Sequence, residues 1–174
     1  MQAPEVSVVL ITERHRYTCA ILAAGRRLLD ILNDRLTDYL WLEEVRVAWG
    51  DDPDQFIATV PRACLRKQAL RAAVITSEVH EAPQSRLISY VPKIRRPVFL
   101  TLPALEVRGT LHLSAWAEPL DTLDPEKGEF FPVTGATLSW GGAGGGSLAA
   151  PVALIRKAWV ELFWVGEARG ERGM

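Results

Sequence analysis

The sequence is poor in the residues that build metal centres and disulfide frameworks. Its 174 residues include only two cysteines and three histidines. The cysteines, Cys19 and Cys64, are distant in the chain, and we expect two buried free thiols. One disulfide bond is the alternative, but no secretory signal supports it. Zinc would need more ligands than two distant cysteines and scattered histidines supply, so we expect no metal site and no cofactor.

Long apolar runs and an excess of positive charge are also missing. The longest apolar run near the N-terminus, residues 19–24 (CAILAA), is too short for a signal peptide or a membrane span. The net charge of -1 removes the simplest argument for nucleic-acid binding, although a local basic patch is still compatible with it. With 48% hydrophobic residues, the chain has enough apolar content for a core. We expect a soluble, cytoplasmic protein.

Two parts of the sequence match each other at a distance of about 90 residues. Residues 151–165 (PVALIRKAWVELFWV) align with residues 61–75 (PRACLRKQALRAAVI) at a distance of 90, and residues 130–140 align with residues 39–49 at a distance of 91. The length changes fall in loops, as expected for a true repeat. We interpret the chain as one unit written twice. The matched pairs in the first alignment include Pro61 and Pro151, Ala63 and Ala153, Leu65 and Ile155, Arg66 and Arg156, and Lys67 and Lys157.

Short segments in both units have the patterns of β-strands. Residues 6–11 are mostly β-branched and apolar, and residues 16–21 alternate between apolar and polar, as do residues 107–113. Residues 61–75 alone contain good helix formers, but their partner is rich in Val, Ile, Trp and Phe and has no helical polar face. We therefore predict strands in both copies, with a helix in the first copy as the alternative.

These patterns predict an all-β protein of two tandem, pseudo-symmetric small β-barrels, with a short helix or a long loop in each. The first unit spans residues 1–82 and the second spans residues 98–174. The linker between them, residues 83–97, contains a basic cluster of Lys93, Arg95 and Arg96.

Two short motifs in the second unit point to a family. Residues 98–100 (VFL) lead into residues 106–111 (EVRGTL), and residues 152–162 (VALIRKAWVEL) contain an Ile-Arg-Lys turn. This arrangement resembles the Sm/Lsm family of small β-barrels, in which a Gly-x-Leu strand precedes a strand-turn-strand with an Ile-Arg-Gly turn. Lys157 stands at the turn glycine, and the family's Asp-x-x-Met-Asn-Leu run is absent. The resemblance implies a small β-barrel whose Arg-containing turn contacts RNA by stacking and by pairing with phosphate.

A second, looser similarity concerns residues 30–33 (DILN). Bacterial proteins of unknown function share the order of strand, Asp-x-Leu-Asn loop and strand. This similarity implies no activity.

No constellation in the sequence predicts catalysis. Nucleophilic catalysis needs a Ser, Cys or Thr with a base beside it, and no Gly-x-Ser-x-Gly motif occurs. His112 alternates with leucines on a predicted strand, so we expect it to face solvent. The glycine-rich residues 141–146 lack the Gly-Lys-Ser/Thr of a phosphate-binding loop and are predicted to form a hairpin loop. We therefore expect a protein that is not an enzyme.

Two functional hypotheses follow. The first is a structural or protein-interaction module, a homo-oligomer or a binder of a protein partner, because residues 162–165 (LFWV) are apolar on both faces of a strand. The second is an RNA- or single-strand-binding protein. The interface residues predicted by the first hypothesis are Trp159, Phe163 and Trp164. The binding residues predicted by the second are Arg66, Lys67, Arg156 and Lys157, together with Lys93, Arg95 and Arg96.

Overall fold

The computed structural model describes residues 5–78, 93–142 and 145–167. Almost all of the regular structure in these residues is β-strand, which confirms the all-β prediction. The elements in chain order are β1 (Glu5–Ile11), β2 (His15–Leu22), α1 (Leu28–Asn33), β3 (Tyr39–Trp49), β4 (Phe56–Arg66), the 3-10 turn η1 (Lys67–Ala69), β5 (Ala72–Glu78), β6 (Lys93–Leu102), β7 (Leu105–Ser114), the 3-10 turns η2 (Pro119–Leu123) and η3 (Pro125–Lys127), β8 (Phe130–Trp140), β9 (Gly146–Arg156), the 3-10 turn η5 (Lys157–Trp159) and β10 (Leu162–Val165).

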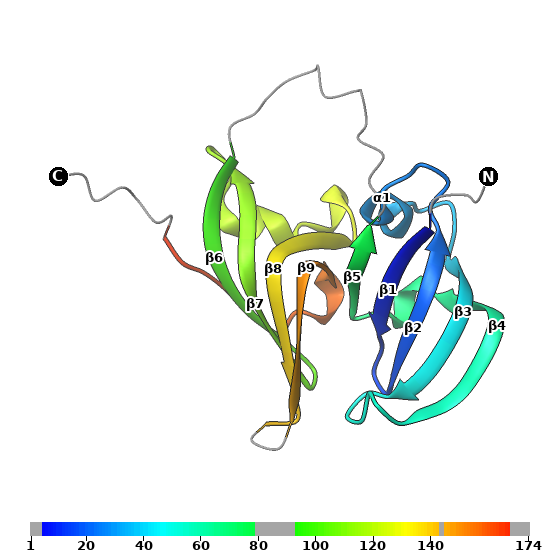
Figure 1. Ribbon diagram of the computed structural model, residues 1–174. Helices are drawn as coiled ribbons and strands as arrows, with labels where there is room; N and C mark the ends of the chain where they lie inside the picture. Colours follow the sequence, from blue (N-terminus) through cyan, green and yellow to red (C-terminus); the bar gives the residue numbers. More distant parts are fainter. Residues whose placement is uncertain (1–4, 79–92, 143–144, 168–174) are drawn as a thin grey trace.

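The ten strands form one antiparallel sheet with the order β10-β6-β7-β8-β9-β5-β1-β2-β3-β4. β1 to β5 make up the first half of the sheet and β6 to β10 the second half, with β5 and β9 side by side where the halves meet (Figure 1). The strand order within the two halves is the same, 5-1-2-3-4 when each half is numbered separately. Among the described residues β4 and β10 do not pair, so the sheet is open and the pairing closes neither half into a barrel.

The strands follow from the period of two in the sequence. In β1, the buried residues Val6, Val8 and Leu10 alternate with Glu5, Ser7 and the half-buried Val9. Because successive side chains of a strand point to opposite faces, this pattern puts one apolar row on the core.

Residues 61–75 form the end of β4, the turn η1 and the start of β5, so the strand prediction is confirmed and only one 3-10 turn is helical. Residues 93–97, which the sequence suggested as the end of a linker, belong to strand β6 and pair with β7. The rest of the predicted linker, residues 83–92, lies outside the described residues. β8 and β9 are consecutive strands that pair from Trp140–Gly146 onward, as predicted for a hairpin.

Both halves contain a β-bulge at the same place. β3 has one residue more than β2 between the pairs Thr18–Arg46 and Ala20–Glu43, and β8 has one more than β7 in the same position. The bulges contain Glu44 (φ 52°) and Gly135 (φ 53°), both in the left-handed region. A glycine in this conformation is typical of a bulge, whereas a glutamate there is strained.

Two buried clusters form the cores. The first core includes Val8, Leu10, Leu28, Leu42 and Val45, and the second core includes Leu100, Val107, Val133 and Leu138. β5 contributes to both, because Ala73 and Ile75 lie in the first core while Ala72 and Val74 lie in the second. This strand is therefore buried on both faces.

The two cysteines are free thiols in different surroundings. Cys19 is buried, and burial raises the pKa of its thiol to about 12. Cys64 is exposed on β4, so the expectation that both thiols are buried is wrong for this residue. The reason is that β4 is an edge strand, with no strand of the described residues on its outer side.

Candidate functional site

The two halves are joined by antiparallel pairing between β5 and β9. The pairs are Ala72–Ile155, Ala73–Leu154, Val74–Ala153 and Ile75–Val152. All eight residues are buried except Val152, which is half-buried. We call this region the junction.

Side chains cross the junction in both directions. Phe130 and Leu154 of the second half belong to the first core, and Ala72 and Val74 of the first half belong to the second core. Because burying a large apolar side chain contributes about 1.5–3 kcal/mol, each half adds substantially to the stability of the other.

Hydrogen bonds fix the relative position of the halves at the junction. Asn33 at the end of α1 donates from Nδ2 to the carbonyl of Phe130 (3.2 Å), and its Oδ1 accepts from the Phe130 N–H (2.8 Å). The backbone N–H of Arg156 donates to the carbonyl of Arg71 (3.0 Å). The Arg156 guanidinium also donates to the carbonyl of Gln68 and to Glu129 Oε2.

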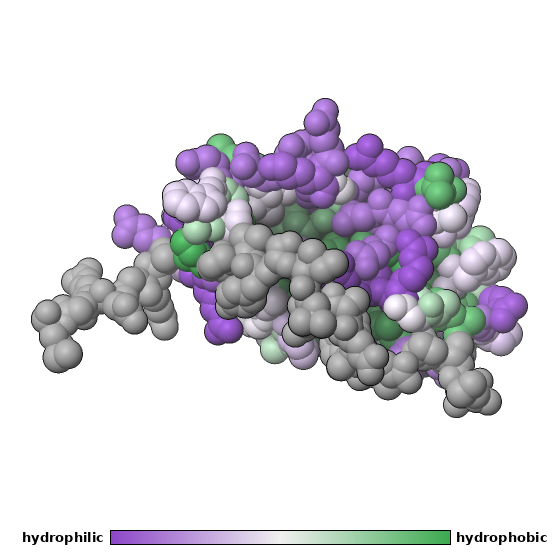
Figure 2. Space-filling model, turned by 90° about the horizontal axis from the view of Figure 1, so that it is seen from above, coloured by the Kyte–Doolittle hydropathy of each residue, from purple (hydrophilic) through white to green (hydrophobic). Residues whose placement is uncertain are grey.

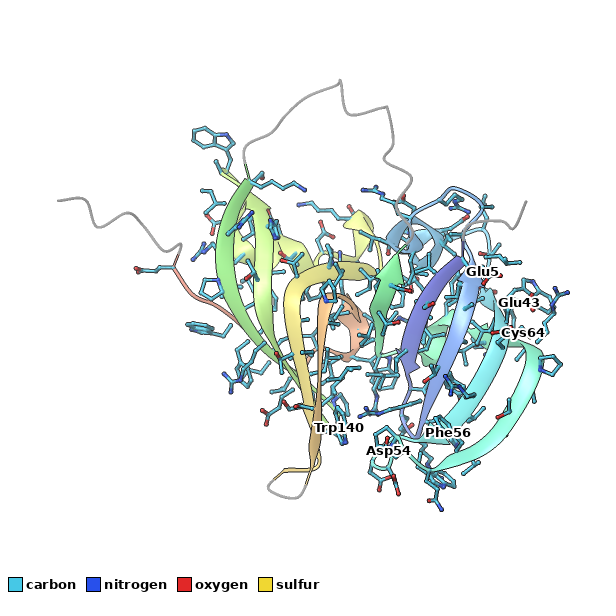
Figure 3. All side chains as sticks on the ribbon, in the orientation of Figure 1. Glu5, Glu43, Asp54, Phe56, Cys64 and Trp140 are labelled. Atoms are coloured by element: carbon cyan, nitrogen blue, oxygen red, sulfur yellow. The ribbon has the colours of Figure 1, made fainter. Side chains whose placement is uncertain are left out.

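The edge strands of the sheet, β4 and β10, each pair with one strand and have none on the outer side among the described residues. They carry large exposed side chains: Leu162 is 49% exposed and Trp164 54%, while Trp41 on β3, beside β4, is 65% exposed. Figure 3 shows Cys64 near the outer margin of the first half. Unpaired strand edges with apolar side chains are sites for pairing with another chain.

The strand registers of the two halves coincide when the residue numbers are shifted by 90. Leu10 pairs with Ala73 in the first half, and Leu100 pairs with Phe163 in the second. We call such residues counterparts; the shift is 91 from α1 to the end of β3. By this correspondence β10 is the counterpart of β5, and the free strand β4 is the counterpart of β9.

Two of the three lysines predicted to bind nucleic acid, Lys67 and Lys157, hydrogen-bond within their own halves. Lys67 is 5% exposed, and its Nζ donates to the carbonyls of Ile31 (2.7 Å) and Asp34 (2.9 Å) and to Thr37 Oγ1 (2.8 Å). Lys157 Nζ donates to the carbonyl of Asp124 (2.6 Å). Burial lowers the pKa of both lysines, and nearby aspartates oppose the shift. These contacts give the repeated lysine a structural role.

The other predicted basic residues lie in three places. Arg156 is at the junction, and Arg66 lies on the free strand β4, where its Nη2 donates to the Tyr39 hydroxyl (3.1 Å). On β6, Lys93 and Arg95 are exposed, while Arg96 donates from Nε to the Gly166 carbonyl (2.7 Å). The structure therefore does not bring these residues together into one patch.

The predicted interface residues are divided between the junction and the outer edge. Trp159 lies at the junction, where the Arg71 guanidinium is 5.0 Å from its ring centre. Phe163 packs edge-on against Phe131 (6.0 Å between ring centres). Trp164 is on the outward face of β10, at the free edge.

Sequence reasoning missed Asn33 as the residue that links the halves. A signal was present, because residues 30–33 (DILN) and 121–124 (DTLD) are counterparts at a distance of 91, and α1 and η2 begin at Leu28 and Pro119. The comparison would have shown a similar turn in both halves, with Asn33 replaced by Asp124 in the second.

Among residues 5–78, 93–142 and 145–167, no three His, Cys, Asp or Glu side chains are grouped as metal ligands. Within the same ranges, no helix is long and apolar enough to cross a membrane. Seen from above, hydrophilic residues cover much of the visible described surface, and hydrophobic residues show between them in the middle as well as at the margins (Figure 2).

Comparisons with known proteins identify no relative. A scan against protein-family models found no match, and searches of curated proteins and of solved structures found none either.

Proposed function

We propose that this chain is a non-enzymatic protein-interaction module that associates with further copies of itself, head to tail, through the free edges of β4 and β10. The observation that supports this function is the junction, where β5 and β9 already pair in this way. The strands left free at the two ends of the sheet are the counterparts of these two strands.

The pairing at the junction gives a register for the proposed contact. Shifting β5 forward by 90 and β9 back by 90 converts each junction pair into a pair between β10 of one copy and β4 of the next. The resulting pairs are Leu162 with Leu65, Phe163 with Cys64, Trp164 with Ala63, and Val165 with Arg62.

The burial pattern supports this register. Ala72 and Val74 are fully buried against the other half at the junction, and their counterparts are the exposed Leu162 and Trp164. The proposed contact would cover both side chains, and each would contribute about 1.5–3 kcal/mol when fully buried.

The backbone supports the same geometry. The N–H of Arg156 donates to the Arg71 carbonyl at the junction, and the counterparts of these groups are the N–H of Arg66 and the carbonyl of Glu161. The Gln68 carbonyl that accepts from Arg156 corresponds to the carbonyl of Ala158. In the proposed assembly, Arg66 bonds to both carbonyls of the neighbouring copy.

A contact between two different edges is heterologous, so every added copy leaves one β4 and one β10 free. Such contacts close into a ring or continue as a filament, depending on the rotation between copies. The shared strand order of the halves supports two tandem units of one kind, each of them open in its strand pairing. A relationship of these units to the Sm/Lsm family rests on the short sequence motifs alone.

Light-scattering mass across a concentration series tests the proposal. We expect a mass above 19.3 kDa that rises with concentration. A single monomer mass at high concentration would contradict self-association.

Cross-linking to the native Cys64 tests the register. Residues directly opposite in an antiparallel pair have Cα atoms about 4.5–5.5 Å apart, which suits a disulfide bond. Under mild oxidation, Phe163→Cys should therefore give disulfide-linked dimers and longer chains. Trp164→Cys is the matched control, because its side chain points to the opposite face, and Phe163→Cys with Cys64→Ser should give no link.

The cross-linking outcomes distinguish self-association in general from the proposed β4–β10 contact and its register. Assembly by mass with links only from Trp164→Cys would place the strands in a shifted register. Assembly without links from either variant would remove the β4–β10 contact and leave self-association through another surface.

The nucleic-acid hypothesis has a narrower basis. Lys93 and Arg95 are exposed on β6, and His112 is cross-strand from Arg95. The ratio of absorbance at 260 and 280 nm on the light-scattering peak tests it. Co-purifying nucleic acid that is lost on replacing Lys93 and Arg95 by alanine would favour this function.

A further inference from the structure

A cavity of about 370 Å³ lies at one end of the junction. The first half lines it with the β1–β2 turn, the start of β5 and the β3–β4 turn, and the second half lines it with the β6–β7 turn and the end of β8. Trp140, which Figure 3 shows at the lower end of β8, forms part of the wall. A ligand here would contact both halves of the sheet.

Arg16 is the least satisfied charged residue on this wall. It is 4% exposed, and its guanidinium stacks on the Trp140 ring at 3.4 Å from the ring centre. Its backbone belongs to the β1–β2–β3 pairing, but the Nε of its side chain is buried without a hydrogen-bond partner among the described residues. A cation–π contact offsets only part of the cost of burying a charge that lacks hydrogen-bond partners.

The pKa of Arg16 also indicates that its buried positive charge is only partly compensated. Burial lowers its pKa to about 10, against the attraction of Asp51. Asp51 therefore attracts the guanidinium without accepting a hydrogen bond from it in the structure.

A second buried arginine faces the same cavity. Arg71 is 5% exposed and donates from Nη1 to the Pro103 carbonyl (2.7 Å), while its Nη2 is 4.0 Å from Glu13 Oε1 and its Nε is buried without a partner. Arg14 is the third arginine on the wall. Three arginines face two carboxylates, Glu13 and Asp51, which leaves the lining with a net charge of +1.

From this arrangement we propose that the cavity binds a small oxyanion, a carboxylate or a phosphate group, whose oxygens accept from Arg16 and Arg71. One flat face of the Arg16 guanidinium is covered by Trp140, so its N–H edge is what remains to be paired, and a planar fork of donors matches a carboxylate or phosphate. The volume is within the range of small-molecule sites.

A second cavity that also has Arg16 in its lining is a poor place for this ligand. It is lined by Asp51, Asp52 and Asp54 as well as by Arg16, and three carboxylates repel an anion. The counterparts of Arg16 and Arg71 are Glu106 and Glu161, so the second half has no equivalent site. We therefore expect one bound oxyanion per chain.

Calorimetric titration and thermal unfolding with sodium phosphate and sodium succinate, against sodium chloride at equal ionic strength, test this site. We expect 1:1 binding and a midpoint of unfolding that rises by several degrees once the ligand is near 100 times its Kd. Phosphate alone, succinate alone, or both raising the midpoint identifies the preferred oxyanion class. No heat and no rise with either salt would overturn the proposal.

Two variants separate the ligand site from a structural role of Arg16. Arg16→Met should abolish the oxyanion-dependent rise while leaving the midpoint in chloride unchanged or higher, because an unpaired buried charge is removed. Arg108→Met is the control, since Arg108 also lies over a ring, that of Phe99 at 4.3 Å, but on the exposed surface; it should keep the rise. A rise that persists in Arg16→Met would overturn the assignment.

Arg16→Lys covers the case in which the Met variant does not fold. Lysine keeps the charge but lacks the planar edge, so oxyanion affinity should fall about tenfold or more. Unchanged affinity in this variant would show that Arg16 does not bind the ligand.

Discussion

The two halves of the sheet have the same strand order, but their corresponding strands β5 and β10 differ in side-chain size and in burial. β5 ends the first half with small residues, and Ala72, Ala73 and Val74 are fully buried because β9 lies beside them. β10 ends the second half with Leu162, Phe163, Trp164 and Val165, which are half-buried or exposed; it pairs with β6 on one side, and no strand of the described chain lies on its other side. Small residues suit an edge whose partner is fixed within the chain, whereas large apolar residues at a free edge are typical of a surface that another chain covers.

The largest difference between the two edges should appear when a charge is placed on each. Val74→Asp puts a carboxylate into the second core without a partner, and we expect a loss of more than about 4 kcal/mol in the free energy of unfolding, or failure to fold. The counterpart Trp164→Asp should leave the fold of the dilute monomer intact and reduce the assembled mass. Urea unfolding at low concentration and light scattering at high concentration measure the two effects.

Alanine variants of the same two residues allow the comparison if Val74→Asp yields no soluble protein. Val74→Ala should still cost about 2 kcal/mol, because a fully buried side chain leaves a cavity. Trp164→Ala should cost much less in the monomer. Equal losses from the two alanine variants would contradict the difference in burial between the edges.

The next largest effect concerns the repeated lysine. Lys67→Met leaves three oxygen acceptors without their buried donor, and we expect a loss of about 2–4 kcal/mol in the free energy of unfolding. Lys157→Met removes one hydrogen bond, to the Asp124 carbonyl, and should cost about 1–2 kcal/mol. The difference measures how much more the first half depends on this contact.

Denaturant midpoints with unchanged slopes check these values, and binding of a single-stranded oligonucleotide at low salt provides the second readout. If both variants keep full stability but one loses oligonucleotide binding, the lysines act in nucleic-acid recognition instead of structure.

The strand pattern was predictable because it depends on local alternation of apolar residues. The period of two in β1 identifies the buried row without knowledge of any neighbour, and the partner stretch 151–165 settles residues 61–75 as strand. The position of β9 beside β5 could not be predicted in this way. The pairing of these two strands depends on contacts between residues far apart in the sequence. One example is the hydrogen bond from Asn33 to Phe130, which are 97 residues apart.

The same reasoning explains what sequence analysis could not show about the candidate sites. Arg66 and Arg156 look equivalent in the sequence, yet Arg156 is held at the junction while Arg66 lies on a free edge. Arg16 reads as the polar member of an alternating strand, which is normally a solvent-facing position. It becomes buried only because the end of β8 brings Trp140 over it.

The smallest predicted effect compares the two bulges. Glu44 and its counterpart Gly135 have nearly the same left-handed φ, 52° and 53°. This conformation is unfavourable for a residue with a Cβ atom, so Glu44→Gly should raise the free energy of unfolding by about 0.5–1 kcal/mol. The reverse change, Gly135→Ala, should lower it by about 1 kcal/mol through backbone strain alone, because a Cβ atom at this position meets nothing within 4 Å.

Urea midpoints of the two variants, measured on dilute protein, check this last comparison. Glutamate at 44 is exposed, so its loss should remove few contacts that offset the gain in backbone freedom. If Glu44→Gly lowers stability, the Glu44 side chain makes a stabilising contact that outweighs its strain. The two bulges would then be alike in backbone geometry but not in energy, and the first half would have a reason of its own for keeping a glutamate where the second half has glycine.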